Sequence, residues 1–129
     1  MIQRIQSLIL LLSALCSLII VFYFPVLQND DIYVSLKEQL SYARLCIFLS
    51  VGLNIFSIFQ FKNRNRQIII NQISKLFISI AFIIVILHKG ELNFTIGLFL
   101  FIIPYSLIIL ANYLIRKDER LVRSADRIR

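Results

Sequence analysis

Long apolar stretches separated by short polar segments are the dominant pattern of this chain. The stretches cover residues 5–27, 45–61, 68–87 and 92–115. Each is close to the roughly 20 residues that a helix needs to cross a hydrocarbon core about 30 Å thick. Backbone groups inside lipid must find partners within the chain, so apolar spans of this length are predicted to be helical. The pattern therefore predicts four transmembrane helices.

The links between these stretches are short, which makes sequential helices antiparallel neighbours. We expect an all-α, integral membrane four-helix bundle that forms a single domain. The expected spans are about 5–27, 43–61, 68–87 and 92–115, followed by a tail at 116–129. The composition agrees with this, because 59% of the residues are hydrophobic and no room is left for a separate soluble domain.

Gly and Pro positions refine the expected helix boundaries. Neither residue occurs in the segment that leads to Gly52, so we expect the second helix to begin near Asp31 and to run unbroken to Phe61. The segment 88–91 is predicted to be a tight turn between antiparallel helices. Pro104 lies inside the fourth span, where its missing N–H predicts a kink.

The net charge of +7 is distributed unevenly along the chain. If the N-terminus lies inside, the inner segments hold ten basic and three acidic residues, whereas the outer segments hold three basic and four acidic residues. An excess of Lys and Arg marks the cytoplasmic side of a membrane protein. We therefore expect both termini in the cytoplasm and no nucleic-acid partner. The first span is predicted to be a retained anchor, because its apolar run is longer than that of a signal peptide.

One side of the second span carries small and polar residues. They recur at three- and four-residue spacing and are Ala43, Cys46, Ser50, Asn54 and Ser57. Small residues let helices approach closely in lipid, and polar ones form hydrogen bonds across the contact. Ser50, Asn54 and Ser57 are therefore candidate interhelical contacts, with Ser13 and Ser17 of the first span as a facing surface. The alternative interpretation is a polar pathway through the membrane.

Lys75 is the only ionisable residue inside a span. Such residues are functional candidates by default, so Lys75 joins the candidate polar contacts. It lies close to the inner end of the third span, and a Lys stem can snorkel to the interface. A proton- or cation-coupled transporter would need a membrane carboxylate, and no Asp or Glu lies in any of the four spans.

The remaining chemically reactive residues are few. Cys16 and Cys46 fall within spans, where a thiol is predicted to be a small apolar packing residue. His88 stands alone at the outer end of the third span, without the partners that a catalytic role needs. We expect no catalytic, cofactor-binding or metal site, and therefore no enzyme.

The C-terminal tail is the most regularly patterned segment. Its arginines follow 4-3-4 spacing and are Arg116, Arg120, Arg123 and Arg127. On a helix they form one stripe, with Leu121, Ala125 and Ile128 on the opposite side. The fourth helix is predicted to continue as a basic amphipathic helix that lies on anionic headgroups or docks on a partner. A solvated flank that only orients the protein is the alternative.

Specific sequence segments occur at both ends of the chain. They are Met1–Ile2–Gln3–Arg4–Ile5–Gln6–Ser7, Ala111–Asn112, Ile115–Arg116–Lys117–Asp118–Glu119, Leu121–Val122–Arg123–Ser124 and Asp126–Arg127–Ile128–Arg129. In these segments the chain resembles an uncharacterised family of small Bacteroidota membrane proteins, a domain of unknown function. The resemblance covers the whole length, although the middle is similar only in hydropathy. It implies a multi-pass protein of the inner membrane of a Gram-negative bacterium, and it implies no catalytic or ligand residue.

These observations favour a non-enzymatic accessory or scaffold subunit. It would bind a partner or anionic lipid through its polar helix faces and basic tail. The alternative is a small transporter or channel that uses Asn54 and Lys75, either as a monomer or as a homodimer. A membrane enzyme is a third and weaker hypothesis. The expected partners are membrane lipids and either another membrane protein or a second copy of the chain.

Overall fold

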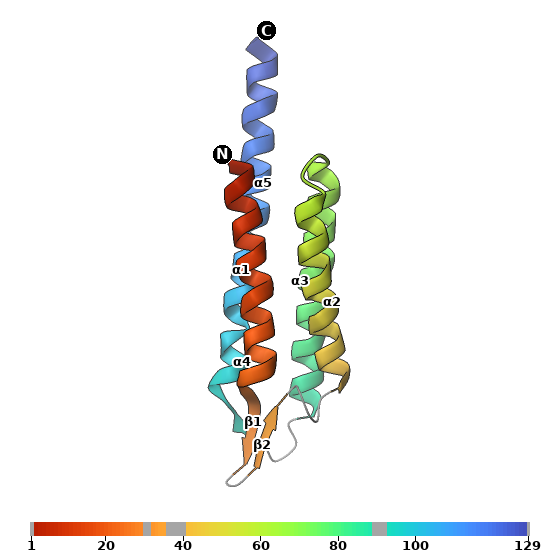
Figure 1. The fold of residues 1–129 in the computed structure, drawn as a ribbon, viewed down its shortest axis with the longest axis vertical. Coiled ribbons are helices and arrows are strands. Elements are labelled where there is room, and N and C mark those ends of the chain that lie inside the picture. The colour runs from red at the N-terminus through yellow and green to blue at the C-terminus, as the bar shows by residue number, and fades with distance from the viewer. Residues whose placement is uncertain (1, 30–31, 36–40, 89–92, 129) are drawn as a thin grey trace.

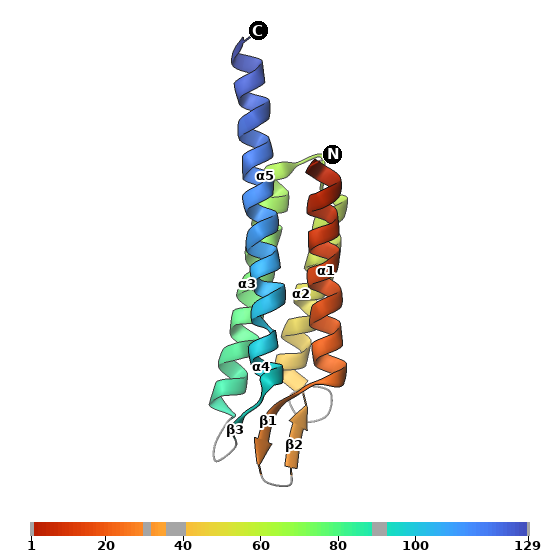
Figure 2. The same ribbon diagram turned by 90° about the vertical axis from the view of Figure 1, so that its left-hand side faces the viewer.

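Four helical rods dominate the structure, a computed structural model that describes residues 2–29, 32–35, 41–88 and 93–128 (Figure 1). The helices are α1 (Ile2–Tyr23), α2 (Ser41–Phe59), α3 (Arg64–Leu87), α4 (Ile96–Leu100) and α5 (Ile102–Ile128). Helices α4 and α5 follow each other along the fourth rod (Figure 2). The rods are long and apolar enough to cross a membrane, which confirms the predicted set of four apolar helices.

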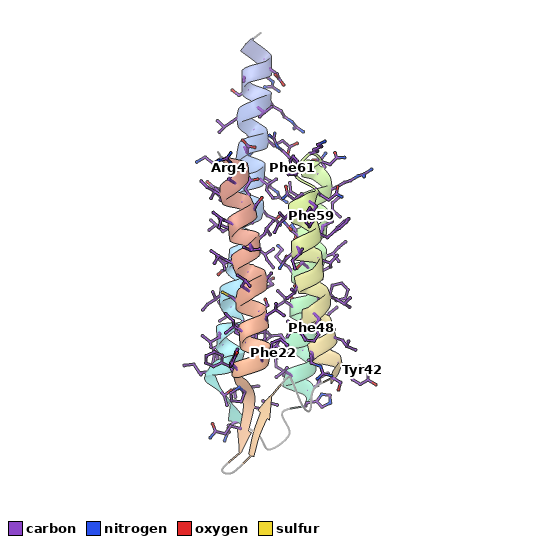
Figure 3. The ribbon with its side chains drawn as sticks, in the orientation of Figure 1. Arg4, Phe22, Tyr42, Phe48, Phe59 and Phe61 are labelled. Atoms are coloured by element: carbon purple, nitrogen blue, oxygen red, sulfur yellow. The ribbon has the colours of Figure 1, made fainter. Side chains whose placement is uncertain are left out.

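Both described ends of the chain lie at the same end of the bundle, together with the connection from α2 to α3 (Figure 1). We call it the termini end, and we call the opposite end the sheet end because the strands lie there. Arg4 and Phe61 lie towards the termini end, whereas Tyr42 lies near the sheet end (Figure 3). Helix α1 packs against α2 and α5, and α3 packs closely against α2 but only loosely against α5. The seam between α3 and α5 is therefore the most open one among these pairs.

The segment after α1 forms a small β-sheet, so the prediction of one unbroken helix from near Asp31 to Phe61 is wrong. Strand β1 (Pro25–Asn29) pairs antiparallel with β2 (Ile32–Ser35) on one edge and with β3 (Asn93–Phe94) on the other. The Ile-Tyr-Val run of β2 is rich in β-branched and aromatic residues, which favour strands. Pairing with β1 also satisfies backbone groups that a lone segment would leave open. Helix α2 accordingly begins later than predicted.

The fourth rod is interrupted at Phe101, between α4 and α5. Pro104 lies three residues further on and cannot donate a hydrogen bond to the carbonyl four residues before it. The N–H of Phe101 bonds to the carbonyl of Leu98 at 3.3 Å, as in a tighter 3₁₀ turn. The kink predicted from Pro104 thus takes the form of a break one turn earlier. The turn predicted at 88–91 lies outside the described residues except for His88, which follows the last residue of α3.

The start of the fourth rod lies directly against β1. The hydroxyl of Thr95 donates a hydrogen bond to the carbonyl oxygen of Pro25. A Cβ atom at Gly97 would overlap this same oxygen, so only glycine allows the backbones to come this close. This contact fastens α4 to the β-sheet and fixes the position of the fourth rod at the sheet end.

Apolar side chains cover the outside of the bundle as well as part of its interior. Towards the sheet end the core is apolar and includes Val21, Ile47, Val85, Leu98 and Phe101. The rings of Phe22 and Phe48, whose centroids are 6.0 Å apart, pack together and join α1 to α2 (Figure 3). On the outer surface, Leu8 and Leu76 are 57% and 61% exposed, and many other large apolar side chains are exposed as well. So large an apolar surface is rare on a soluble protein and suits a bundle surrounded by lipid.

Candidate functional site

A hydrogen-bonded polar network crosses the middle of the bundle. We call it the Asn54 network, and its members, all fully buried, are Ser13 of α1, Ser50 and Asn54 of α2, and Ser74 of α3. The Asn54 amide donates to the Ser13 hydroxyl at 3.2 Å and accepts from the Ser74 hydroxyl at 2.8 Å. The Ser50 and Ser74 hydroxyl oxygens lie 2.7 Å apart. One amide therefore joins three helices.

The donors and acceptors of this network form one consistent chain. Because the Ser74 hydroxyl donates to Asn54, the Ser50 hydroxyl is the donor in its contact with Ser74. At the other end the Ser13 hydroxyl donates to the carbonyl oxygen of Pro104 at 3.3 Å, which adds α5. All four rods are thus linked through neutral groups that satisfy one another. This arrangement can hold helices together, and it contains no titratable group that would move a proton.

A second polar contact lies closer to the termini end. Asn71 of α3 donates from its Nδ2 atom to the Oδ1 atom of Asn112 on α5, at 2.8 Å. The Oδ1 atom of Asn71, the Nδ2 atom of Asn112 and the Nε2 atom of Gln6 are buried without a hydrogen-bond partner. Buried polar atoms usually have partners, so each of the three calls for an explanation. This part of the interior is the least satisfied in the described residues.

The other two predicted contacts lie elsewhere. Ser57 is fully buried, and its hydroxyl donates a long hydrogen bond of 3.5 Å to the carbonyl oxygen of Gln67. Lys75 is half-buried and lines a groove between α3 and α5, whereas Ser74 before it turns towards α2. The structure therefore brings Ser50 and Asn54 together, and it places Ser57 and Lys75 outside their network.

The groove beside Lys75 has a volume of about 520 Å³ and lies towards the termini end. Its basic lining residues are Lys75, Arg116, Lys117 and Arg120. Asn112 and Tyr113 also line it, and among the described lining residues none is acidic. Like charges held close together in this way repel one another, so the groove would be stabilised by an anion.

The predicted arginine stripe is divided by the structure. Arg116 and Arg120 line the groove, whereas Arg123 forms an ion pair with Glu119 at 2.9 Å. Asp118 pairs with Arg64 at 2.9 Å and ties α5 to the start of α3. Beyond this tie every residue from 120 to 127 is exposed, and α5 projects past the other rods (Figure 1). We call residues 120–127 the arm.

Reactive side chains are scattered in the described part of the chain. Cys16 and Cys46 are free and half-buried. No group of three or more His, Cys, Asp or Glu side chains that could hold a metal ion occurs among the described residues. The Nδ1 atom of His88 lies 3.0 Å from the carbonyl oxygen of Ile84, in the last turn of α3. The site therefore offers hydrogen bonding and positive charge as its chemistry.

Sequence reasoning singled out Asn54 but not its partner Ser74, and it missed the Asn71–Asn112 contact. A signal was present, because the buried face of α3 begins with Gln67, Asn71 and Ser74 at four- and three-residue spacing. The buried face of α3 thus starts with polar residues and continues with apolar ones. The partner on α5 had no comparable pattern.

Comparison with known proteins identifies the chain at the level of its family. The model of a domain of unknown function, DUF4293, matches residues 2–128, and the chain therefore belongs to this family. No curated protein and no solved structure matches the chain. The family assignment supports the uncharacterised family expected from the two ends of the sequence.

Proposed function

We propose that this DUF4293 protein is a non-enzymatic accessory or scaffold subunit of the inner membrane of a Gram-negative bacterium of the Bacteroidota. The four rods anchor it, and the arm docks on an acidic surface of a partner protein in the cytoplasm. The observation that carries this proposal is the exposure of every arm residue, 120 to 127, beyond the last ion pair between helices. A helix that only completed the bundle would have no need of this extension.

The chemistry of the arm favours an acidic protein surface. Arg120 and Arg127 are exposed on the side that also carries Arg123, and no apolar core covers them. Leu121 and Val122, 52% and 42% exposed, offer apolar contact area on the other sides of the same helix. Arginine binds carboxylates through paired hydrogen bonds, and mixed charged and apolar surfaces are typical of protein interfaces.

Docking through the arm is tested by moving the arm's charges to another side of the helix without changing their number. The phase-shifted variant combines Leu121→Arg, Arg123→Leu, Ala125→Arg and Arg127→Ala. Membrane orientation depends on the number of basic residues and is indifferent to helical phase, so insertion should be unchanged. We expect co-purification of the partner to fall at least about tenfold, a loss of roughly 1.4 kcal/mol in binding. The measurement is quantitative recovery from mild detergent at low and high salt.

Two results would contradict the docking proposal. One is equal recovery of the same proteins with the native and phase-shifted chains. The other is recovery that does not weaken with added salt, because salt shortens the Debye length from about 8 Å at physiological ionic strength to about 3 Å at 1 M and so screens exposed charges. A chain with Lys62→Gln and Arg66→Gln is the control, since both residues are exposed at the termini end but lie outside the arm.

The proposed orientation places the termini end in the cytoplasm. It is supported by the excess of basic residues in the segments that the bundle gathers at this end. Reporter fusions after Arg129 should read as cytoplasmic, and reporter insertions within 30–38 should read as periplasmic. A periplasmic signal after Arg129 would reverse the orientation and remove the cytoplasmic partner from consideration.

A small transporter or channel is the alternative function, and it draws less support from the described contacts. The Asn54 network is closed by its own hydrogen bonds and carries no charge. Lys75 lines the α3–α5 groove and is not a member of that network. A coupled transporter needs a group that changes its charge or its ligands during the cycle. Loss of a solute flux in Lys75→Gln at normal protein level would favour the transporter.

A further inference from the structure

Two hollows follow one another along the open seam between α3 and α5. The first is the basic groove described above, which includes Lys75 of α3 and Ile109 of α5. The second has a volume of about 320 Å³ and begins one helical turn further towards the sheet end, at Ser79 and Tyr105. The two hollows therefore share both helices and continue in the same direction.

The second hollow is an apolar slot. Its lining includes Ile78, Phe82, Ile86, Phe101 and Ile102. From Lys75 to Ile86 the chain advances eleven residues, which is about 16 Å at 1.5 Å per residue of helix. One leaflet of a hydrocarbon core about 30 Å thick has a similar depth. Measured from Lys75, the groove and the slot together therefore have the length of an acyl chain in one leaflet.

We propose that the α3–α5 seam binds one anionic phospholipid from the leaflet at the termini end. Its phosphate lies between Lys75, Arg116 and Arg120, and one acyl chain follows the apolar slot. This inference goes beyond the proposed function, because it concerns the seam between α3 and α5, which shares only Arg120 with the arm. It also assigns a role to Lys75, the only charged residue in the four long apolar stretches of the sequence.

The lining of the groove supports an anionic oxygen ligand in two independent ways. Its basic residues have no acidic neighbour among the described lining residues, so a phosphate would relieve their mutual repulsion. Asn112 also lines the groove, is 5% exposed, and has an Nδ2 donor without a partner. A headgroup oxygen would satisfy this donor. Glu119, on an adjoining hollow, is already paired with Arg123 at 2.9 Å.

The continuity of the two hollows favours a phospholipid over a free anion or a peptide. A phosphate ion would use the groove but leave the apolar slot empty. A second membrane helix would cover the slot but would bury the cations without partners, which costs several kcal/mol for each charge. Basic pockets between membrane helices are a known way to hold anionic headgroups.

The proposal is tested by lipid binding to the full chain in nanodiscs, followed by native mass spectrometry. Phosphatidylglycerol and cardiolipin should remain bound, whereas zwitterionic phosphatidylethanolamine should be lost. Lys75→Gln combined with Arg116→Gln should weaken retention about tenfold or more. The matched control, Lys62→Gln with Arg66→Gln, removes two exposed cations outside the groove and should change retention less than about threefold.

Two further variants separate the lipid from other ligands and from misfolding. Lys75→Arg keeps the charge and should retain the lipid. Ser79→Phe fills the slot and should weaken retention of long-chain lipid while leaving inorganic phosphate binding unchanged. Equal retention by the groove variant and its control would overturn the proposal. Equal retention of zwitterionic and anionic lipid would also overturn it. So would binding of inorganic phosphate as strong as that of lipid, or the finding that a second copy of the chain occupies the seam and excludes lipid.

Discussion

Asn54→Leu is expected to destabilise the bundle by about 1–2 kcal/mol, the upper part of the range measured for hydrogen bonds inside membrane proteins. The side chain bonds to α1 through Ser13 and to α3 through Ser74. Leucine removes both bonds and leaves two fully buried hydroxyls with fewer partners. The measurement is reversible unfolding of the full chain in mixed micelles.

Ser57→Ala is the matched control on the same helix. Ser57 is as buried as Asn54, but its contact is a single bond of 3.5 Å, so the variant should change stability by less than about 0.5 kcal/mol. A double-mutant cycle of Asn54→Leu with Ser74→Ala should show that the two losses are not additive, since the residues are partners. Additive losses, or a stabilised Asn54→Leu chain, would show that α2 presents another face to its neighbours.

Gly97→Ala is expected to destabilise the protein by about 1–3 kcal/mol, the usual cost of overpacking. The new methyl group would overlap the carbonyl oxygen of Pro25, which is backbone and cannot rotate away as a side chain can. Helix α4 would have to move away from β1, and the bond from Thr95 to the same oxygen would weaken. The loss is measured by thermal unfolding in detergent.

Gly52→Ala provides the comparison, because nothing lies within 4 Å of the Cβ position at Gly52. Alanine favours a helix over glycine by roughly 0.5–1 kcal/mol, so this variant should be neutral or slightly more stable. If Gly97→Ala were tolerated as well as Gly52→Ala, the close contact of α4 with β1 would be wrong.

The positions of the four rods could be predicted from hydropathy because lipid imposes a simple rule. A backbone inside hydrocarbon must satisfy its own polar groups, so most of each long apolar stretch forms a helix. The prediction is wrong at 25–27 and 93–94, which lie in strands. The polar face of α2 was visible as well, because Ser50 and Asn54 share one side at helical spacing. The hydrogen-bonded network forms on that face.

The β-sheet could not be predicted in the same way. Outside lipid, water can satisfy the backbone, and a short apolar run such as that of β2 is compatible with a helix or a strand. Strand formation here also depends on a distant segment, because β1 pairs with β3, which lies far along the chain. The absence of Gly and Pro before Gly52 permitted a helix but did not require one.

The α3–α5 seam also could not be predicted from the sequence, for a geometric reason. Hydropathy gives the length of each helix but neither its rotation nor its neighbours across the bundle. Lys75 and Arg116 are far apart in the chain, and only the packing of α5 beside α3 places them in one groove. The same packing divides the arginine stripe between the groove and the arm.

Docking of the arm on an acidic protein surface is tested most directly by photocrosslinking in cells from position 124. Ser124 is exposed and flanks Arg123 and Arg127, whereas Leu76 is 61% exposed on the outer surface of the bundle and serves as the reference position. We predict a discrete protein adduct from position 124 that is absent from position 76. This adduct should disappear when the four substitutions of the phase-shifted variant are added to the chain. An adduct of equal yield in the phase-shifted chain, or adducts to lipid alone, would contradict the proposal.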